Sequence, residues 1–395
     1  MTPRRVTAAL AVLGLGAIVA TGCAGSDRTA ATTFTVPKVT TPLTTTTTTS
    51  TSTTTTTTPP PRASLAGLSP GFSLADLPAS EFTATLDAIA ATDVRWLRVD
   101  FDWSVIQAAG PDRYDWARTD RIVSAASARH LSIIALMTYT PAWARPFGTP
   151  DKNPPSNPDD FARFVSTAAQ RYAPFGVATW EIWNEPNVAT FWYPRPDPEA
   201  YTALLVRAAA AIRAVEPHST IISGGLSPAS DAANGSQVDV RTFLARVYAA
   251  GGGTAFDAVG LHPYSFPRLP TFPADYNTFL TAPALHQLMI DHGDGAKQIW
   301  GTEIGAPTEG GGGAVTEAVQ SQIIVQAYQQ WTAWKFTGPL IWFSFADSGF
   351  DPANREAHFG LVDASGRRKA GFSVFVGVVQ ALLARQPPAP EPSGH

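Results

Sequence analysis

Short apolar runs alternate with longer segments along most of this chain, and in the longer segments apolar residues recur every three or four positions. The short runs are typical of buried parallel strands, and the longer segments of helices that cover one face of a sheet. Eight runs are the predicted strands: 65–74, 94–101, 131–139, 177–183, 220–226, 255–261, 298–303 and 340–345. The clearest helical patterns between them are 161–172, 199–215, 240–248 and 316–335. The alternation predicts a parallel sheet with crossover helices.

Eight strand and helix units over about 320 residues fit a (β/α)8 TIM barrel with some long loops. The alternative is an open doubly wound sheet, which lacks support because no Gly-rich nucleotide-binding loop follows the first predicted strand. The sequence therefore predicts an α/β fold of the TIM barrel type, with a single domain over residues 63–385.

The N-terminus has the features of a targeting segment. Arg4 and Arg5 precede an apolar stretch, 6–20, that is too short to span a membrane comfortably, and small residues then lead to Cys23, the single cysteine. This series resembles a bacterial lipoprotein signal, which implies a signal peptide over residues 1–22 and acylation of Cys23. An ordinary cleaved signal peptide with an incidental cysteine is the alternative.

The two segments that flank the predicted barrel have low-complexity compositions. Residues 23–62 are almost entirely Thr, Ser, Pro and Ala, which cannot bury apolar surface and predict a disordered linker. Residues 386–395 are rich in proline and predict a flexible tail. We therefore expect an extracytoplasmic protein that is either secreted or tethered to the membrane through a lipid on Cys23.

The overall composition narrows the class of function. The chain has 395 residues, of which 44% are hydrophobic and 15% charged, and its formal net charge is −4. No broad basic field is available for nucleic acid, so nucleic-acid binding is not expected. The 11 Trp and 9 Tyr residues offer flat amphipathic rings that suit sugar faces.

Two glutamates follow predicted strands. The fourth strand ends in the run Asn184-Glu185-Pro186-Asn187, and the seventh ends in Glu303. Reactive groups of TIM barrels lie at the carboxyl ends of the strands, so both carboxylates are expected at one mouth. A retaining glycosidase needs two carboxyl groups about 5 to 5.5 Å apart in such a place.

These residues resemble the clan A glycoside hydrolases, with families 5, 39 and 51 the most similar. The run WNEPN over residues 183–187 and the glutamate that ends the seventh strand carry the resemblance, which extends over roughly residues 65–382. It implies a retaining glycoside hydrolase in which Glu185 is the acid/base and Glu303 the nucleophile. It also implies that no cofactor or metal takes part.

Further positions match the clan in chain order. Arg98 is similar to the arginine that ends the second strand, and His262 with Tyr264 to the His-x-Tyr that ends the sixth. The resemblance implies that Asn184 binds the sugar 2-hydroxyl and that Trp342, on the eighth strand, lies under the bound sugar. Arg98 and Tyr264 would favour the charged form of Glu303.

Other polar and aromatic residues have competing interpretations. Glu181 precedes Trp183 by two positions on the same strand, and a structural ion pair explains it better than catalysis. Asp100 and Asp102 could be a metal pair but are better explained as loop hydrogen-bonding groups. Trp143 is a candidate sugar platform, as is Trp192, although loop packing explains both equally well.

Three functions from different classes remain. The first is a retaining hydrolase of poly- or oligosaccharides, which is expected to be a monomer. The second is a non-catalytic carbohydrate-binding lipoprotein, and the third a structural or adhesive surface protein, neither of which requires two glutamates at strand ends. Within the first, the substrate stays open among galactofuranosides, arabinofuranosides, β-xylosides and β-glucans. The long segments 186–197, 265–277 and 309–316 are expected to make that choice.

Overall fold

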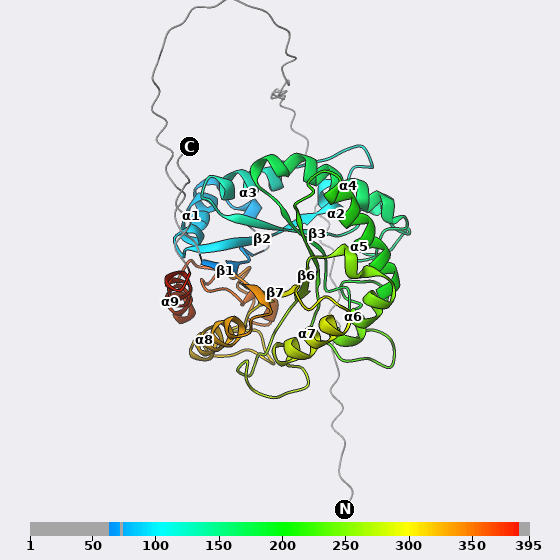
Figure 1. The fold of residues 1–395 in the computed structure, drawn as a ribbon. Helices are drawn as coiled ribbons and strands as arrows, with labels where there is room; N and C mark the ends of the chain where they lie inside the picture. Colours follow the sequence, from blue (N-terminus) through cyan, green and yellow to red (C-terminus); the bar gives the residue numbers. More distant parts are fainter. Residues whose placement is uncertain (1–62, 72–73, 387–395) are drawn as a thin grey trace, which may run out of the picture. The chain divides into compact units, whose positions relative to one another are not determined.

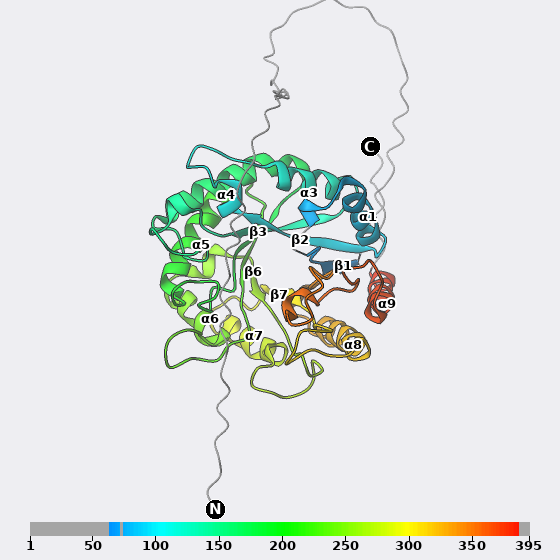
Figure 2. The ribbon, with the colours of Figure 1, turned by 180° about the vertical axis from the view of Figure 1, so that it is seen from behind.

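Eight parallel strands close into a barrel in the order of the sequence, so the predicted fold class is confirmed. The computed structural model describes residues 63–71 and 74–386. In Figures 1 and 2, which show opposite sides, helices form a ring around the strands. The strands are β1 (Ala63–Leu68), β2 (Val94–Asp102), β3 (Ser132–Thr138), β4 (Thr179–Asn184), β5 (Thr220–Gly225), β6 (Ala258–Leu261), β7 (Gln298–Ile304) and β8 (Thr337–Trp342).

One long helix follows each strand and returns the chain to the opposite end of the barrel. These helices are α1 (Ala79–Ala90), α3 (Ala117–Ser127), α4 (Pro158–Tyr172), α5 (Pro198–Arg213), α6 (Val240–Ala249), α7 (Ala282–Asp291), α8 (Glu317–Ala333) and α9 (Ala370–Ala384). A short additional helix, α2 (Trp103–Ile106), follows β2 directly. Side chains at the N-caps of several helices accept hydrogen bonds from free backbone N–H groups, as Asn157 does for α4 and Asp197 for α5.

The apolar core has two parts. The larger part lies between the strands and the surrounding helices, where the outward-facing strand residues meet the buried faces of the helices. The smaller part fills the lower interior of the barrel, and its members are Ile134, Ile222, Ala258, Trp300 and Ile341, with Trp96 against them. This plug closes the N-terminal end of the barrel, so polar groups above it can open only toward the C-terminal mouth.

Several strand boundaries differ from their predictions; β6, for example, begins at Ala258, three residues after its predicted start. β1 ends at Leu68, not at residue 74, because Pro70 and Gly71 turn the chain away, and Gly71 has a positive φ of 96°. β8 begins at Thr337, three residues before its predicted start. The register between β7 and β8 shifts next to Gly338 and Pro339. Gly and Pro are typical of turns in a sequence, so the pattern did not predict the start of a strand there.

Several predictions concern residues outside the described part of the chain. These are the signal peptide 1–22, the lipid on Cys23, the linker 23–62, and the tail from 387 onward. Gln386, the first residue of the predicted tail, is described, and its side chain accepts a hydrogen bond of 3.0 Å from the backbone N–H of Ser64 in β1. Among the described residues, no helix combines the length and the apolar character that crossing a bilayer requires.

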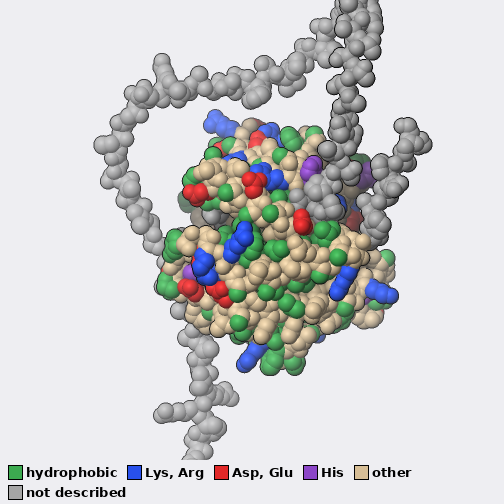
Figure 3. Space-filling model, turned by 90° about the vertical axis from the view of Figure 1, so that its left-hand side faces the viewer, with side chains coloured by type: hydrophobic (Ala, Val, Ile, Leu, Met, Phe, Trp, Pro, Cys, Tyr) green, Lys and Arg blue, Asp and Glu red, His purple; other side chains and the backbone are tan. Residues whose placement is uncertain are grey.

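Charged side chains on the outside of the barrel are mixed in sign. Figure 3 shows Lys and Arg interspersed with Asp and Glu over one side of the molecule. Many are paired between neighbouring helices, such as Arg207 of α5 with Asp159 of α4 and Arg246 of α6 with Glu199 of α5. Such exposed pairs contribute little to stability individually, about 0 to 1 kcal/mol each.

Candidate active site

A buried ion pair lies inside the barrel above the apolar plug. Arg98 of β2 donates through Nε to Glu181 of β4 at 2.6 Å, and Glu181 also accepts a 3.0 Å bond from the backbone N–H of Gly225. Arg98 is 4% exposed and Glu181 is fully buried. Glu181 is therefore the structural ion-pair partner that the sequence indicated. Glu181 holds the guanidinium of Arg98 so that the remaining N–H donors of Arg98 point toward the C-terminal mouth of the barrel.

Glu303, at the end of β7, receives those donors. Arg98 Nη1 donates to Glu303 Oε1 at 2.5 Å, and the hydroxyl of Tyr264 donates to Glu303 Oε2 at 2.9 Å. Burial alone would raise the pKa of Glu303, but the charges of His262 and Arg98, with the hydrogen bonds from Tyr264 and Arg98, lower it below its usual value. Glu303 is thus held as a charged carboxylate.

Glu185 follows β4 in an unusual backbone conformation. Trp183 and Glu185 both have positive φ angles, 73° and 47°, which residues with a side chain rarely adopt. The surroundings fix this path, because Trp183 is fully buried and donates from Nε1 to the carbonyl of Phe191, while the N–H of Glu185 donates to the carbonyl of Gly225. The local turn places the Glu185 carboxylate at the mouth of the barrel.

His262, just after β6, lies between the two glutamates. Its Nδ1 is 2.8 Å from Glu185 Oε1 and 3.5 Å from Glu303 Oε2. The ring is completely buried, which lowers the pKa of His262, but the charges of Glu303 and Glu185 and the hydrogen bond with Glu185 outweigh burial and raise it. The ring packs against Gly225, where an added methyl group would overlap both the imidazole and the Thr302 hydroxyl.

Asn184 completes this polar layer. Its Oδ1 accepts a 3.0 Å hydrogen bond from Arg98 Nη2, and the residue lines the cavity beside Glu185. That bond fixes the amide orientation and turns the Nδ2 donor away from Arg98. The structure therefore brings together five of the predicted residues around Arg98: Asn184, Glu185, His262, Tyr264 and Glu303.

A cavity of about 870 Å³ opens above this layer at the C-terminal end of the barrel. Its walls come from the loops after β4 and β6, as predicted, and also from the loops after β1, β2 and β8. No residue of the predicted selectivity segment 309–316 is among its lining residues. The lining side chains include Arg98, Asp100, Tyr139, Asn184, Glu185, Tyr264, Glu303, Phe343 and Phe359.

The candidate tryptophans lie away from the cavity surface. Trp342 is fully buried at the end of β8, and the next residue, Phe343, lines the cavity instead. Trp143 donates from Nε1 to the carbonyl of Gln107 at 2.7 Å and packs edge-on against Trp103. Trp192 is 2% exposed and packs against Trp183. Loop packing accounts for both Trp143 and Trp192.

Sequence reasoning missed other residues of the cavity wall. Tyr139 ends the predicted third strand, but nothing in the sequence apart from its aromatic side chain indicated that it lines the cavity. Phe343 lies within the predicted eighth strand, where Trp342 was the candidate instead, and Phe359 comes from the β8–α9 loop, which has no periodic pattern. Asp102 is a loop hydrogen-bonding group as predicted, since it caps α2 by accepting bonds from Ser104. Asp100 makes no such bond within the described residues.

Glu185, His262 and Glu303 also form a group that could hold a metal ion. One ligand atom from each residue lies within 4.8 Å of the others. Two carboxylates and an imidazole suit zinc or iron. An ion there would compete with Arg98 and Tyr264 for Glu303, so the geometry fits a metal less well than a free carboxylate pair. The prediction of a site without metal stays a prediction.

Comparison with known proteins relates this barrel to carbohydrate-active enzymes. The family model described as cellulase (glycosyl hydrolase family 5) matches residues 64–250, from β1 to the end of α6. None of the curated proteins matches the sequence. The match to the family model includes Arg98, Asn184 and Glu185, and it ends before His262 and Glu303.

Solved structures with the same fold extend over the whole barrel. A family 39 glycoside hydrolase from Bacteroides cellulosilyticus WH2 is 22% identical, with a TM-score of 0.66 over 81% of this chain and 64% of that one. A monomeric beta-xylosidase from Caulobacter crescentus CB15 is 18% identical, with a TM-score of 0.60 over 80% and 68%. A family 5 subfamily 18 protein from Streptomyces cattleya, in complex with Manβ1-4GlcNAc, is 17% identical, with a TM-score of 0.63 over 83% and 82%. This chain thus spans only 64% of the length of the family 39 structure.

Over residues 64–250 the chain is therefore similar to the family 5 glycosyl hydrolases, and its barrel has the fold of clan A glycoside hydrolases. Within that clan, the family model that matches its N-terminal half is that of family 5, and its structural neighbours include family 39 as well. The resemblance that the sequence indicated is confirmed, and the match to a glycosyl hydrolase model supports the predicted enzyme class.

Proposed function

We propose that this protein is a retaining glycoside hydrolase, with Glu303 as the nucleophile and Glu185 as the acid/base. One observation supports this most directly: one oxygen of each carboxylate lies within 4.8 Å of the other residue's oxygen, yet the two groups have different partners. Retaining enzymes hold their carboxyl groups about 5 to 5.5 Å apart, and inverting enzymes about 6.5 to 9.5 Å apart. The short separation favours double displacement.

In the first step, Glu303 attacks the anomeric carbon while Glu185 gives its proton to the leaving oxygen. The glycosidic C–O bond breaks, an ester forms between the sugar and Glu303, and the aglycone leaves as an alcohol. Arg98 and Tyr264 keep Glu303 charged and aimed before the attack. His262 lies within hydrogen-bonding distance of Glu185 and so can hold or return the proton that Glu185 transfers.

In the second step, Glu185 accepts a proton from water, whose oxygen attacks the anomeric carbon. The ester to Glu303 breaks, and the carboxylate returns to its bonds with Arg98 and Tyr264. Asn184 is oriented by Arg98 so that its Nδ2 can donate to the sugar 2-hydroxyl, a bond that strengthens in both transition states. The anomeric configuration is retained because it is inverted twice.

The nucleophile assignment is tested with Glu303→Ala. This variant should lose hydrolysis of an activated aryl glycoside, and added azide should restore turnover with a product of inverted anomeric configuration, determined by NMR. Arg367→Ala, which removes a charged side chain from an exposed ion pair, is a control for loss of charge. Near-normal activity of Glu303→Ala would overturn the assignment.

The acid/base assignment is tested separately with Glu185→Ala. Substrates with good leaving groups should still form the covalent intermediate, because they need no protonation, but the intermediate should hydrolyse slowly. A burst of released aryl alcohol followed by a slow steady state is the expected trace. Equal rate losses for good and poor leaving groups would contradict the role of Glu185 as the acid.

We further propose that the enzyme acts outside the cytoplasm on polysaccharides or oligosaccharides, with furanosides, β-xylosides and β-glucans as the substrates to screen. The targeting features of residues 1–22 and the position of Cys23 support this location. Palmitate labelling of the intact chain should be lost in Cys23→Ala. Labelling that persists in that variant would exclude a lipid anchor at this cysteine.

A further inference from the structure

Asp100 is an acidic residue of the cavity without a partner. It lies two residues after Arg98 on β2, so both side chains are on the inner face of the strand, with Asp100 nearer the mouth. Within residues 63–71 and 74–386, its carboxylate makes no hydrogen bond or ion pair. Asp102, on the same face, caps α2, and Asp115, also in the cavity wall, accepts a bond from Ala117. Asp100 alone among these three stays unbonded.

Its electrostatic surroundings make this arrangement unfavourable in the free enzyme. The side chain is exposed, but only toward the cavity that it lines, and protein atoms surround it on the other sides. This loss of solvent, together with the charges of Asp102, Glu303 and Glu181, raises the pKa of Asp100 to about 6 despite the nearby charge of Arg98. At neutral pH the carboxylate is therefore mostly charged and unsatisfied.

Tyr139 supplies a second polar group on the same wall. It is 9% exposed and lines the cavity after β3, the neighbouring strand. Its ring is held between Lys152 Nζ, 3.7 Å from the ring centroid, and Phe191, which stacks at 6.4 Å. No hydrogen bond of its hydroxyl group is found within the described residues. Asp100 pairs with Leu136 of β3, three residues before Tyr139, and both Asp100 and Tyr139 line the same cavity.

We propose that Asp100 and Tyr139 form a hydroxyl-binding wall that determines specificity for the glycone, the sugar that becomes bonded to Glu303. This inference rests on the proposed function. A carboxylate accepts several hydrogen bonds, and bonds to a charged acceptor are about twice as strong as neutral ones. Neutral sugar hydroxyls can donate such hydrogen bonds to the Asp100 carboxylate, whereas a carboxylate on the sugar would be repelled by it.

The position of Asp100 and Tyr139 in the cavity indicates that they contact the glycone and not the aglycone. Asp100 lies two residues after Arg98 on the same face of β2, and Arg98 donates a hydrogen bond to the nucleophile Glu303. In double displacement the glycone is attached to the nucleophile, and the aglycone leaves past the acid. The wall made by β2 and β3 beside Arg98 therefore contacts the sugar that stays on the enzyme.

The test compares a cleaved aryl glycoside with its monodeoxy analogues, each lacking one hydroxyl group. For the parent sugar, Asp100→Asn and Tyr139→Phe in the full chain should each lower kcat/KM by about 10- to 100-fold. For the analogue that lacks the hydroxyl bound by Asp100, wild type and Asp100→Asn should differ by less than about threefold. Asp112→Asn, a change of one charge on an exposed residue of the same β2–α3 connection, should behave like wild type.

A second measurement separates binding from a structural role. Because the charged carboxylate is disfavoured in the folded protein, Asp100→Asn should raise Tm at pH 7. The gain should shrink as the pH falls below about 6 and disappear below about pH 3, where Asp100 is protonated in both the folded and the unfolded chain. A structural residue would lose stability instead. An aminodeoxy analogue that is preferred by wild type, but not by Asp100→Asn, would show that the wall binds an ammonium group and would overturn the hydroxyl assignment.

The outcomes distinguish the two proposals. If Asp100→Asn loses the same factor on the parent and on every deoxy analogue, the wall does not bind glycone hydroxyls and this inference is wrong, while the hydrolase stands. If wild type cleaves no glycoside, or if Glu303→Ala keeps its activity, the proposed function fails and this inference fails with it.

Discussion

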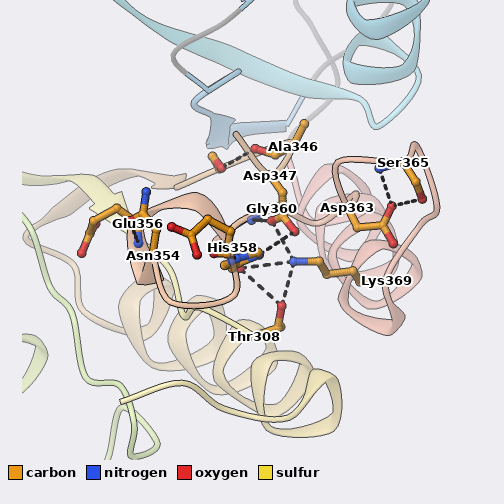
Figure 4. A network of polar contacts seen from close by, with 12 residues as sticks. Thr308, Ala346, Asp347, Asn354, Glu356, His358, Gly360, Asp363, Ser365 and Lys369 are labelled. Carbon is orange, nitrogen blue, oxygen red and sulfur yellow. Dashed lines mark hydrogen bonds and ion pairs between the residues drawn. The ribbon is translucent and has the colours of Figure 1, made fainter. Parts of the chain in front are cut away.

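Two buried clusters of charge in this protein differ in how completely their members are bonded. One surrounds Arg98 inside the barrel, and the other surrounds Lys369 at the start of α9 (Figure 4). Lys369 Nζ donates to Thr308 Oγ1 and Asp347 Oδ1, both at 2.8 Å, and to the carbonyl of His358 at 3.2 Å. An ammonium group has three donors, so this cation is saturated.

The cluster around Arg98 is only partly closed. Its lower members, Arg98 and Glu181, are bonded on all sides, but Glu185 and Glu303 keep oxygens toward the cavity, and His262 Nε2 is buried with no partner within the described residues. An unsatisfied buried polar group costs about 1–3 kcal/mol, so such groups persist where a ligand or a reaction uses them. The comparison indicates that saturated buried charge is structural in this fold and unsaturated charge is functional.

The largest effect should come from opening the saturated cluster. Lys369→Met leaves Asp347, which is 3% exposed, charged and without its cation, so the free energy of unfolding should fall by about 3–5 kcal/mol. None of the three partners of Lys369 lines the cavity, so kcat/KM of the folded enzyme should change little. Urea unfolding and steady-state kinetics measure the two quantities. Lys335→Met, at an exposed lysine, is the control.

A result in the opposite sense would break the comparison. If Lys369→Met unfolds like wild type but loses most of its kcat/KM, the cluster in Figure 4 acts on the active site and saturation does not identify structural charge. Replacing Lys369 and Asp347 together by apolar residues should be less harmful than Lys369→Met, because no unpaired charge then remains.

The next effect tests the unsaturated cluster without removing any of its polar groups. A methyl group at Gly225 would overlap the ring of His262 and must displace it from its position between the two glutamates. Because a displacement of about 1 Å can cost about 100-fold in rate, Gly225→Ala should lower kcat/KM by about that factor. Gly377→Ala in α9, where an added methyl group meets open space, is the matched control. Normal kinetics of Gly225→Ala would show that the position of His262 is unimportant.

The sequence predicted the fold and the polar centre because each depends on a regular feature. Apolar runs gave the eight strands in order, and the rule that strands end at one mouth brought Glu185 and Glu303 together. The wall of the cavity depends on irregular loops and on the exact residue at which each strand ends. The hydrophobic periodicity of the sequence predicts neither. Trp342 and Phe343 are adjacent aromatic residues at a strand end, so an error of one position exchanges a ring of the core for the ring that lines the cavity.

The two aspartates after Arg98 illustrate the same limit. Asp100 and Asp102 share one face of β2 and look equivalent in the sequence. Only the short helix that starts at Trp103 distinguishes them, because its free N–H groups bond Asp102 and leave Asp100 open. A helix of four residues carries no hydrophobic period, so its start could not be predicted.

A smaller effect concerns one bond of the unsaturated cluster. Tyr264→Phe removes the hydroxyl that donates to Glu303, so kcat/KM should fall about 10-fold. That hydroxyl lowers the pKa of Glu303, so without it the pKa rises, and the acidic limb of the kcat/KM profile should move to higher pH. Tyr328→Phe removes a buried hydroxyl that donates to the carbonyl of Leu340, and it should lower stability without moving the limb. An unshifted limb in Tyr264→Phe would separate Tyr264 from the ionisation of Glu303.

The smallest effect applies the comparison to a neutral side chain. The indole N–H of Trp143 is satisfied by the carbonyl of Gln107, so Trp143 should be structural although it is a candidate sugar platform. Trp143→Phe should lower the free energy of unfolding by about 1 kcal/mol, the value of one hydrogen bond, with kcat/KM within about twofold of wild type. Phe343→Ala, at the cavity wall, should instead raise KM. If Trp143→Phe raises KM as much as Phe343→Ala, then a satisfied side chain also contacts the sugar, and saturation separates structure from function only for charged groups.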